Sequence, residues 1–389
     1  MSDGLFRSFF LGGFECSSHR LACGRRLDMG AATGHDRHVA SDYLRLREQG
    51  IRTAREGLRW PIVEPSPERY DFASVLPTLR AARETGVEIL WDLFHYGWPD
   101  DIDIFSPEFV RRLGLLARAF ARVLAGEGDA VPWLVPINEI SFLAWTGGEI
   151  GRLNPFAHSR GLELKRQLVR AAIEAIESAW AVVPSARVVH VDPIFHVVAD
   201  PDRPQEAFAA EAYRRLQFQA LDMLCGRQEP ELGGDPRYLD VIGVNYYPWN
   251  QWIYKGPTED GTTIGPSDPR YRPFRDMLRE HHEHYGRPLL ISETGTEGDE
   301  RAEWLRHVGR EVRAALWGGV PIEGICLYPI VNFPGWDDER HCHNGLWDYA
   351  DEAGDRDLHR PLALELRRQR RRIERLRRAC APRLGALPS

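Results

Sequence analysis

The chain has 389 residues, of which 43% are hydrophobic and 28% charged, a composition typical of globular proteins with enough apolar side chains for a large core. Its net charge of −7 disfavours nucleic acid and anionic membranes as partners. The six cysteines are scattered without a CxxC pair, and no apolar run approaches the roughly 18 residues of a membrane helix. The first twenty residues lack the pattern of a signal peptide, so we expect a cytoplasmic protein.

Short apolar runs alternate with amphipathic segments along the whole chain. In order, a strand and the helix that follows it are predicted at residues 9–15 and 36–49, 52–60 and 72–85, 87–95 and 106–125, 133–139 and 162–183, 187–192 and 205–225, 240–247 and 271–285, 288–294 and 301–317, and 322–330 and 361–377. Eight such pairs without an internal repeat or linker predict a single (β/α)8 barrel domain over residues 1–389, with a basic C-terminal helix and short tail at about 361–389.

The predicted connections differ in length on the two sides of this barrel. A single glycine, Gly86, separates one helix from the next strand, whereas the segments that follow strands are long. Long loops on one face predict a functional site at the carboxyl ends of the strands. The four longest are residues 16–35, 141–161, 248–269 and 331–360.

Two of the predicted strands end in a carboxylate. The run 288–294 carries Glu293 near its end, and the run 133–139 ends in Glu139. A glutamate at the end of a single strand is usually a solvated or salt-bridged residue. In one barrel, however, both would face the same opening, and paired carboxylates are the groups that hydrolyse glycosidic bonds.

Further polar and aromatic side chains lie at the other strand ends. Each alone has a structural alternative, such as a salt bridge at the rim or packing within a loop. Together they suit a neutral polyol ring and an oxocarbenium-like transition state. They are Glu15, His19, Arg55, Arg59, His95, Asn138, Asn245, Tyr247, Tyr328 and Trp336.

The sequence resembles the retaining β-glycosidases of clan A and is most similar to glycoside hydrolase family 1. Six segments carry the resemblance, in the family's order along the chain. They are residues 9–19 (FFLGGFECSSH), 55–60 (REGLRW), 93–99 (LFHYGWP), 138–139 (NE), 243–247 (GVNYY) and 291–295 (ISETG).

The resemblance implies a role for each matching residue. Glu293 would be the nucleophile and Glu139 the acid/base, with Arg55 and Tyr247 supporting the nucleophile. We therefore expect a raised pKa for Glu139 and a lowered one for Glu293. No cofactor and no metal is implied. The implied substrate-binding residues are Asn138, His95, His19, Asn245, Tyr328, Trp336 and Asp337.

Three positions depart from the family pattern. His19 stands where the family has a glutamine, Tyr328 replaces a tryptophan, and Pro334–Gly335 precede Trp336 where the family has a glutamate. Either Asp337 or Asp338 would take over the role of that glutamate.

We expect a β-glucosidase-like enzyme that acts on a small-molecule or oligosaccharide glycoside. The loop aromatics Trp145, Trp249, Trp252, Tyr254 and Trp336 would line a pocket closed at one end, which predicts exo action. The alternatives are an endo-acting glycanase of the same clan and a catalytically silent carbohydrate-binding barrel.

Two histidine clusters and one arginine run suggest other functions. The cluster 281–284 (HHEH) precedes a strand and so belongs to the face opposite the site, and in 341–343 (HCH) a substrate-facing histidine is preferred over a metal ligand. The run 367–378 is rich in arginine but has an apolar edge, so we interpret it as a solvated closing helix.

Overall fold

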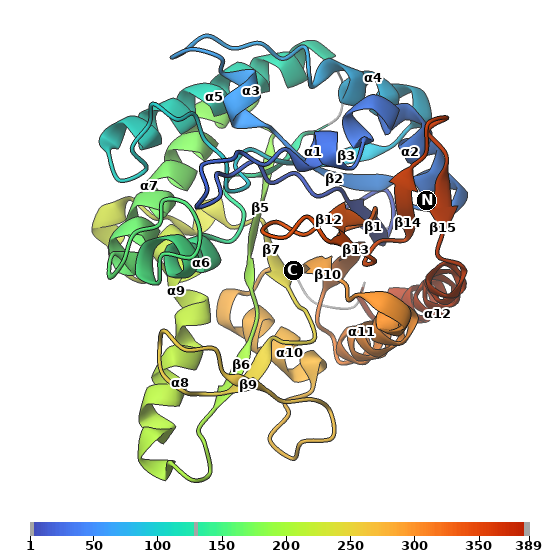
Figure 1. Ribbon diagram of the computed structural model, residues 1–389. Coiled ribbons are helices and arrows are strands. Elements are labelled where there is room, and N and C mark those ends of the chain that lie inside the picture. The colour runs from blue at the N-terminus through green and yellow to red at the C-terminus, as the bar shows by residue number, and fades with distance from the viewer. Residues whose placement is uncertain (1–3, 128–130, 385–389) are drawn as a thin grey trace.

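The computed structural model describes residues 4–127 and 131–384 as a closed barrel of parallel strands surrounded by helices (Figure 1). Around the barrel the strand order is β1-β11-β10-β7-β5-β4-β3-β2, and every neighbouring pair is parallel. This arrangement confirms the predicted (β/α)8 fold. The barrel strands are β1 (Phe10–Gly13), β2 (Thr53–Gly57), β3 (Glu88–Asp92), β4 (Trp133–Val135), β5 (Arg187–Pro193), β7 (Val241–Asn245), β10 (Leu289–Thr294) and β11 (Ile322–Leu327).

The principal helices lie outside the barrel, close to their predicted positions. The exception is the predicted helix 205–225, which is divided into α8 and α9 by a 3-10 turn at Leu216–Phe218. Of these two helices, α8 packs on β6 and α9 packs on α7. The helices are α1 (Met29–Ala32), α2 (His35–Glu48), α3 (Trp60–Val63), α4 (Leu76–Thr85), α5 (Pro107–Glu127), α6 (Ile140–Leu143), α7 (Gly161–Trp180), α8 (Ala207–Arg215), α9 (Gln219–Leu224), α10 (Phe274–Tyr285), α11 (Arg301–Trp317) and α12 (Arg360–Leu384).

Most barrel strands are shorter than predicted. β2 ends at Gly57 and α3 begins at Trp60, while β4 comprises only Trp133–Val135. The apolar runs continue beyond the strands because the first residues of the following loops are themselves buried. Candidate residues such as Arg59, Asn138 and Glu139 therefore lie in the short buried segments directly after the strands.

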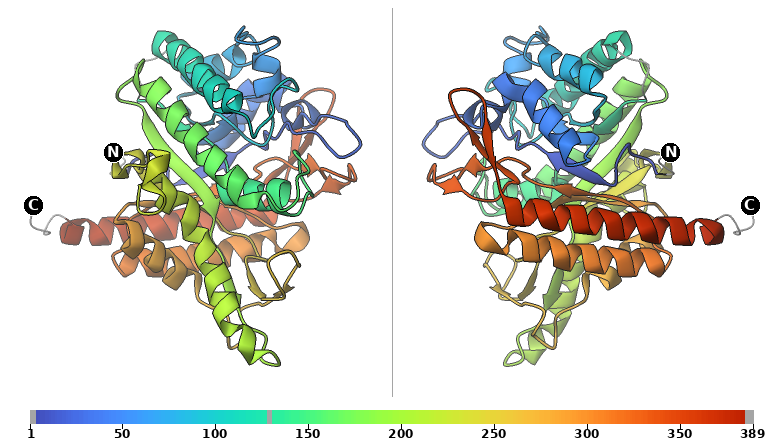
Figure 2. Two further views of the ribbon diagram at one scale, coloured as in Figure 1. Left: turned by 90° about the vertical axis from the view of Figure 1, so that its left-hand side faces the viewer. Right: turned by 90° about the vertical axis from the view of Figure 1, so that its right-hand side faces the viewer.

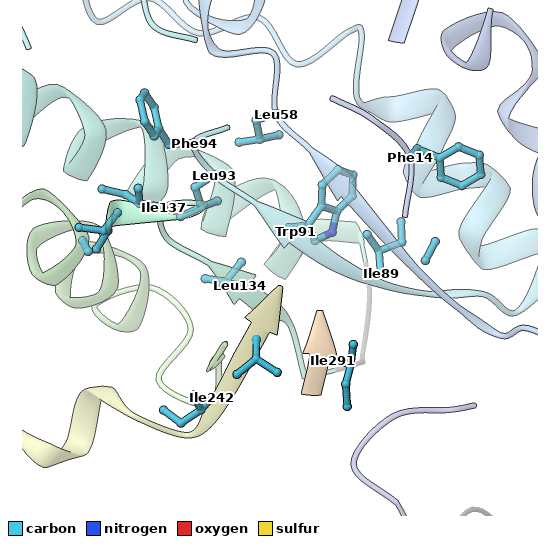
Figure 3. Packing of buried hydrophobic residues seen from close by; sticks show 14 of the residues in the cluster. Phe14, Leu58, Ile89, Trp91, Leu93, Phe94, Leu134, Ile137, Ile242 and Ile291 are labelled. Carbon is cyan, nitrogen blue, oxygen red and sulfur yellow. The ribbon is translucent and has the colours of Figure 1, made fainter. Parts of the chain in front are cut away.

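Alternation along the strands sorts the core into two layers. Leu90 of β3 points into the barrel, whereas its neighbours Ile89 and Trp91 pack against the helices. The Trp91 ring lies 5.1 Å from Phe120 of α5 in an edge-to-face contact. Figure 3 shows Ile89 and Trp91 with Leu134, Ile242 and Ile291 in this outer layer.

The long loops form small sheets of their own. β6 (His196–Val198), β8 (Gln251–Ile253) and β9 (Thr262–Thr263) make a three-stranded sheet that packs with α8, and this unit, the arm, projects from the barrel (Figure 2). After β11 the chain forms two hairpins, β12 (Phe333–Pro334) with β13 (His341–Cys342) and β14 (Trp347–Ala350) with β15 (Arg356–Leu358). α12 then runs alongside α11 (Figure 2).

A buried ionic network joins the last hairpin to the first helices. His35 contacts Asp42 at 2.8 Å and Glu56 at 3.0 Å, and Arg356 of β15 donates to both oxygens of Asp42, at 2.7 and 3.0 Å. Burial lowers the pKa of His35, but the carboxylates of Glu56 and Asp42 more than offset it and raise that pKa to about 9. The ring of Phe14 stacks on His35 at 3.6 Å. Among the described helices, none combines the length and apolar character that crossing a membrane requires.

Candidate active site

The two predicted catalytic carboxylates lie at the carboxyl ends of β10 and β4. Glu293 is part of β10, and Glu139 follows β4 at the start of α6. Both are buried, with exposed fractions of 5% and 9%. Glu139 has a φ of 47°, in the left-handed region, a strained conformation that clusters at functional sites.

Glu293 is bound through both of its carboxyl oxygens. Arg55 of β2 donates from Nη1 to Oε1 at 2.6 Å, and the hydroxyl of Tyr247 donates to Oε2 at 2.8 Å. Arg55 also donates to both oxygens of Asp92, from Nε at 3.0 Å and from Nη2 at 2.7 Å. The guanidinium is therefore fixed from two sides, and its charge is directed at Glu293.

Glu139 receives neutral donors. The amide of Asn245 donates to Oε1 at 2.8 Å, and the hydroxyl of Tyr96 donates to Oε2. The hydroxyl of Ser292 donates to Oδ1 of Asn245 at 2.7 Å, so the nitrogen of that amide faces Glu139. The carboxyl group is therefore oriented by fixed dipoles and not by a cation.

Asn138 connects the two sets of contacts. Its Oδ1 accepts from Nη2 of Arg55 at 2.7 Å, and its Nδ2 donates to the hydroxyl of Tyr96 at 2.9 Å. The same Nδ2 lies 3.3 Å from Nε2 of His95, whose Nδ1 is 2.8 Å from Asp92. Through these contacts the structure brings together Glu139, Glu293, Arg55, Tyr247, Asn138, His95 and Asn245.

Burial dominates the protonation of both carboxylates. Burial and the nearby charge of Glu293 raise the pKa of Glu139 to about 8, as expected for an acid, against the donors Tyr96 and Asn245. Burial also raises the pKa of Glu293, although Arg55, His95 and Tyr247 act to lower it. The prediction of a lowered pKa for Glu293 is therefore wrong in direction. Arg55 and His95 nevertheless favour the charged form of Glu293, and that charge in turn favours the protonated form of Glu139.

His19, Tyr328 and Trp336 lie beside this cluster. The ring of His19 is 4.7 Å from that of Trp336 and 6.3 Å from that of Tyr96. Tyr328 stacks parallel to His95 at 6.1 Å and lies 5.2 Å from the guanidinium of Arg55. Both nitrogens of His19 and Nε1 of Trp336 are buried without a hydrogen-bond partner in the described part of the chain. Burial, His95 and Arg26 lower the pKa of His19 to about 3, so its ring is neutral at ordinary pH.

Other predicted residues lie apart from the carboxylates. Arg59 pairs with Asp28 at 2.9 Å and with Asp36 at 3.6 Å. Asp337 is exposed in the turn between β12 and β13. Its alternative, Asp338, is also exposed and accepts a hydrogen bond from the backbone N–H of Arg340.

The loop aromatics divide into two groups. Trp252 and Tyr254 pack in the arm, where Trp252 contacts Phe195 at 5.2 Å and Tyr254 contacts Tyr213 at 5.6 Å. The prediction that these two line the pocket is therefore wrong, because their loop folds into a small sheet in which Tyr254 is buried and Trp252 is half-buried. Trp249, in contrast, is 58% exposed and stacks on Tyr247 with ring centroids 5.1 Å apart.

No protein-family model and no curated protein matches this chain. Solved structures do match. A family 1 β-glucosidase from Thermotoga maritima has a TM-score of 0.74 and 14% identity, with 94% of this chain and 98% of that chain covered. A β-glucosidase from Thermotoga maritima in complex with glucoimidazole has a TM-score of 0.75 and 15% identity, with 94% of this chain and 97% of that chain covered. A mutant hyperthermophilic β-glucosidase that forms a dodecamer in its crystal has a TM-score of 0.75 and 15% identity, with 94% of this chain and 100% of that chain covered.

The chain has the fold of these β-glucosidases. The resemblance recognised in the sequence is confirmed at this level, over nearly the whole chain. At 14–15% identity the likeness establishes the arrangement of the strands and helices. The chemistry of the site depends on this chain's own residues.

Two residues of the cluster, Tyr96 and Asp92, were not among those predicted from the sequence. Tyr96 follows His95 within the segment 93–99, and Asp92 ends the apolar run of β3. A buried carboxylate at a strand end was the same signal that identified Glu139, so Asp92 could have been found. Tyr96 has a φ of 64°, which no sequence pattern indicated.

Two groups of side chains hold possible metal-ligand atoms within 4.8 Å of one another among the described residues. In the first, Cys16, Asp92 and His95, the carboxylate of Asp92 is already bound by Arg55. The second, His341, His343 and Asp348, is half-exposed on the last hairpins, and His341 contacts Asp348 at 2.6 Å. In the cluster 281–284, the histidines contact separate groups, with His281 next to the carbonyl of Met277 and His284 next to Asp222.

Proposed function

We propose that this protein is a β-glycosidase of the retaining type, most similar in chemistry to the β-glucosidases whose fold it shares. The observation that carries the proposal is the unequal environment of two neighbouring buried carboxylates. Glu293 is held by a cation and a hydroxyl, and Glu139 by neutral donors. Pairs whose environments separate their protonation states are how an acid and a nucleophile are assigned at one site.

In the first step, Glu293 attacks the anomeric carbon and Glu139 gives its proton to the leaving glycosidic oxygen. The bond to the aglycone breaks, and an ester forms between the sugar and Glu293. Arg55 and Tyr247 orient the attacking carboxylate and favour its ionised form before attack. Burial keeps Glu139 protonated at neutral pH, as this step requires.

In the second step, Glu139, now ionised, takes a proton from water. The water oxygen attacks the anomeric carbon, the ester breaks, and Glu293 leaves as a carboxylate. Two inversions give net retention of configuration. For direct attack, the two carboxyl groups are expected to lie about 5–5.5 Å apart.

Sugar recognition would use neutral donors and acceptors beside the carboxylates. Asn138 and His95 would contact hydroxyls nearest the anomeric carbon, and His19 and Trp336 those farther away. The unpartnered nitrogens of His19 and Trp336 support this role, because buried polar groups usually have a hydrogen-bond partner. Neutral His19 can both donate to and accept from a hydroxyl.

The test of the mechanism uses nitrophenyl β-glycosides with the variants Glu293→Ala and Glu139→Ala. Both are expected to lose at least a thousandfold in kcat with poor leaving groups, while Glu163→Ala, an exposed glutamate paired with Arg160, serves as the matched control. Added azide should rescue Glu293→Ala to give the α-glycosyl azide and Glu139→Ala to give the β-glycosyl azide. Full activity in Glu293→Ala, or first release of the α-anomer by the native protein, would contradict the proposal.

The expected exo action has a separate test. A labelled oligosaccharide should lose single sugars from its non-reducing end. Early appearance of mid-chain fragments would indicate the endo-acting alternative.

A further inference from the structure

Tyr96 is held rigidly at the centre of the carboxylate cluster. It is 2% exposed, and its φ of 64° lies in the left-handed region, a strained conformation for a residue other than glycine. Its ring packs edge-on against His95 at 4.8 Å and Trp336 at 6.0 Å, and tilted against Phe142 at 5.8 Å. Strain of this kind persists only where the surrounding packing over-determines the conformation.

The direction of the Tyr96 hydroxyl proton follows from its neighbours. A guanidinium has no acceptor, so Arg55 donates to Asn138, and the oxygen of that amide faces Arg55. The amide nitrogen of Asn138 must then donate to the hydroxyl oxygen of Tyr96 at 2.9 Å. The tyrosine proton is left pointing at Oε2 of Glu139.

We propose that Tyr96 is a positioning residue for the acid/base, and that its directed hydroxyl both orients the carboxyl group of Glu139 and stabilises its ionised form. The inference rests on the proposed function of Glu139. The hydroxyl of Tyr96 is a donor that favours the ionised form of Glu139, whereas burial favours the protonated form.

Several charged or titratable groups face Glu139 from the surrounding strands. Glu293 of β10 and Asp192 of β5 both raise the pKa of Glu139. Arg55 of β2 and Tyr247, after β7, act mainly on Glu293, to which they are hydrogen-bonded. Tyr96 and Asn245 are the donors that act in the opposite direction, and they bind different oxygens of the carboxyl group.

The variant Tyr96→Phe removes the hydroxyl and keeps the ring with its packing. Because a hydrogen bond to a charged group stabilises the charge, its loss should move the basic limb of the kcat/KM profile upward by about one to two pH units. At neutral pH, kcat for dinitrophenyl β-glucoside should fall roughly tenfold, because the second step needs ionised, oriented Glu139.

A matched control lies outside the barrel. Tyr238 donates to Oε1 of Glu177 at 2.7 Å, far along the chain from the site. Tyr238→Phe removes the same kind of tyrosine–glutamate hydrogen bond and should leave the basic limb in place. Thermal unfolding of both variants reports whether the fold is intact.

Replacing Tyr96 by 3,5-difluorotyrosine provides the opposite perturbation with the shape nearly unchanged. Its hydroxyl is a stronger donor, so the basic limb should move to lower pH. This measurement also decides the matter if Tyr96→Phe does not fold.

The two possible failures are distinguishable. A basic limb that stays in place in folded Tyr96→Phe, or in the fluorinated protein, would overturn the inference while Glu139→Gln still abolishes that limb. A limb that is insensitive to Glu139→Gln itself would instead overturn the proposed function.

Discussion

Asp92 accepts two hydrogen bonds from Arg55, at 3.0 and 2.7 Å, in a fully buried pair next to Glu293. Removing one partner of a buried ion pair costs about 3–5 kcal/mol, because the other charge is left without compensation. Asp92→Ala should therefore lower the free energy of unfolding by about this amount, measured by urea denaturation. Asp100→Ala, which breaks exposed pairs with Arg20 and Arg26, should cost about 1 kcal/mol or less. Equal losses in the two variants would contradict the assignment.

The dependence of activity on pH should follow the ionisation of Glu139. Its pKa of about 8 lies above the ordinary value of 4.5, and the first step uses the protonated form. Activity is therefore expected to be present below pH 8 and to fall as the pH rises through it. A kcat/KM profile with an aryl β-glucoside measures this, and Glu139→Gln should remove the basic limb. A limb retained in that variant would exclude Glu139 as its source.

The buried His35 should make stability depend on pH. Its pKa in the folded protein is about 9, above the ordinary value of 6.5, so its stabilising contribution is complete below about pH 6.5. That contribution, on the order of 3 kcal/mol, is lost as the pH rises through about 9. Unfolding free energies at pH 6 and 9.5 should differ by less in His35→Gln than in the native protein. His38→Gln on the same helix is the control, and an equal change there would refute the assignment.

Trp249 should bind the aglycone. It is 58% exposed and stacked on Tyr247, whose hydroxyl contacts Glu293, so its ring lies next to a residue of the reaction centre. Loss of one stacking contact of about 1 kcal/mol should lower kcat/KM for naphthyl β-glucoside roughly fivefold in Trp249→Ala, with little change for methyl β-glucoside. Trp317→Ala, at the other end of the barrel and equally exposed, is the control. A uniform loss for both substrates would argue against an aglycone site.

The sequence was sufficient to predict the barrel and the two carboxylates. Apolar runs with a glutamate at the end are a local signal, and barrel closure brings Glu139 and Glu293 together without further information. Arg55, Tyr247 and Asn138 were placed by the same reasoning and by the family resemblance.

The remaining features depend on geometry that no local pattern carries. The left-handed backbone at Tyr96 brings its hydroxyl to Glu139, and the small sheet of the arm packs Trp252 against Phe195. The extent of burial explains why the pKa of Glu293 moves upward despite its contact with Arg55. Neighbouring charges can be anticipated from motifs, whereas the desolvation that opposes them depends on the complete packing.

Arg356 enters the Asp42–His35 network from β15, more than three hundred residues along the chain from its partner. During synthesis the amino-terminal helices emerge long before this arginine. Until it arrives, Asp42 lacks the two hydrogen bonds from Arg356 and has only His35 and Arg45 as partners. The network around Asp42 is therefore expected to be complete only after the last hairpin has left the ribosome, at the end of translation.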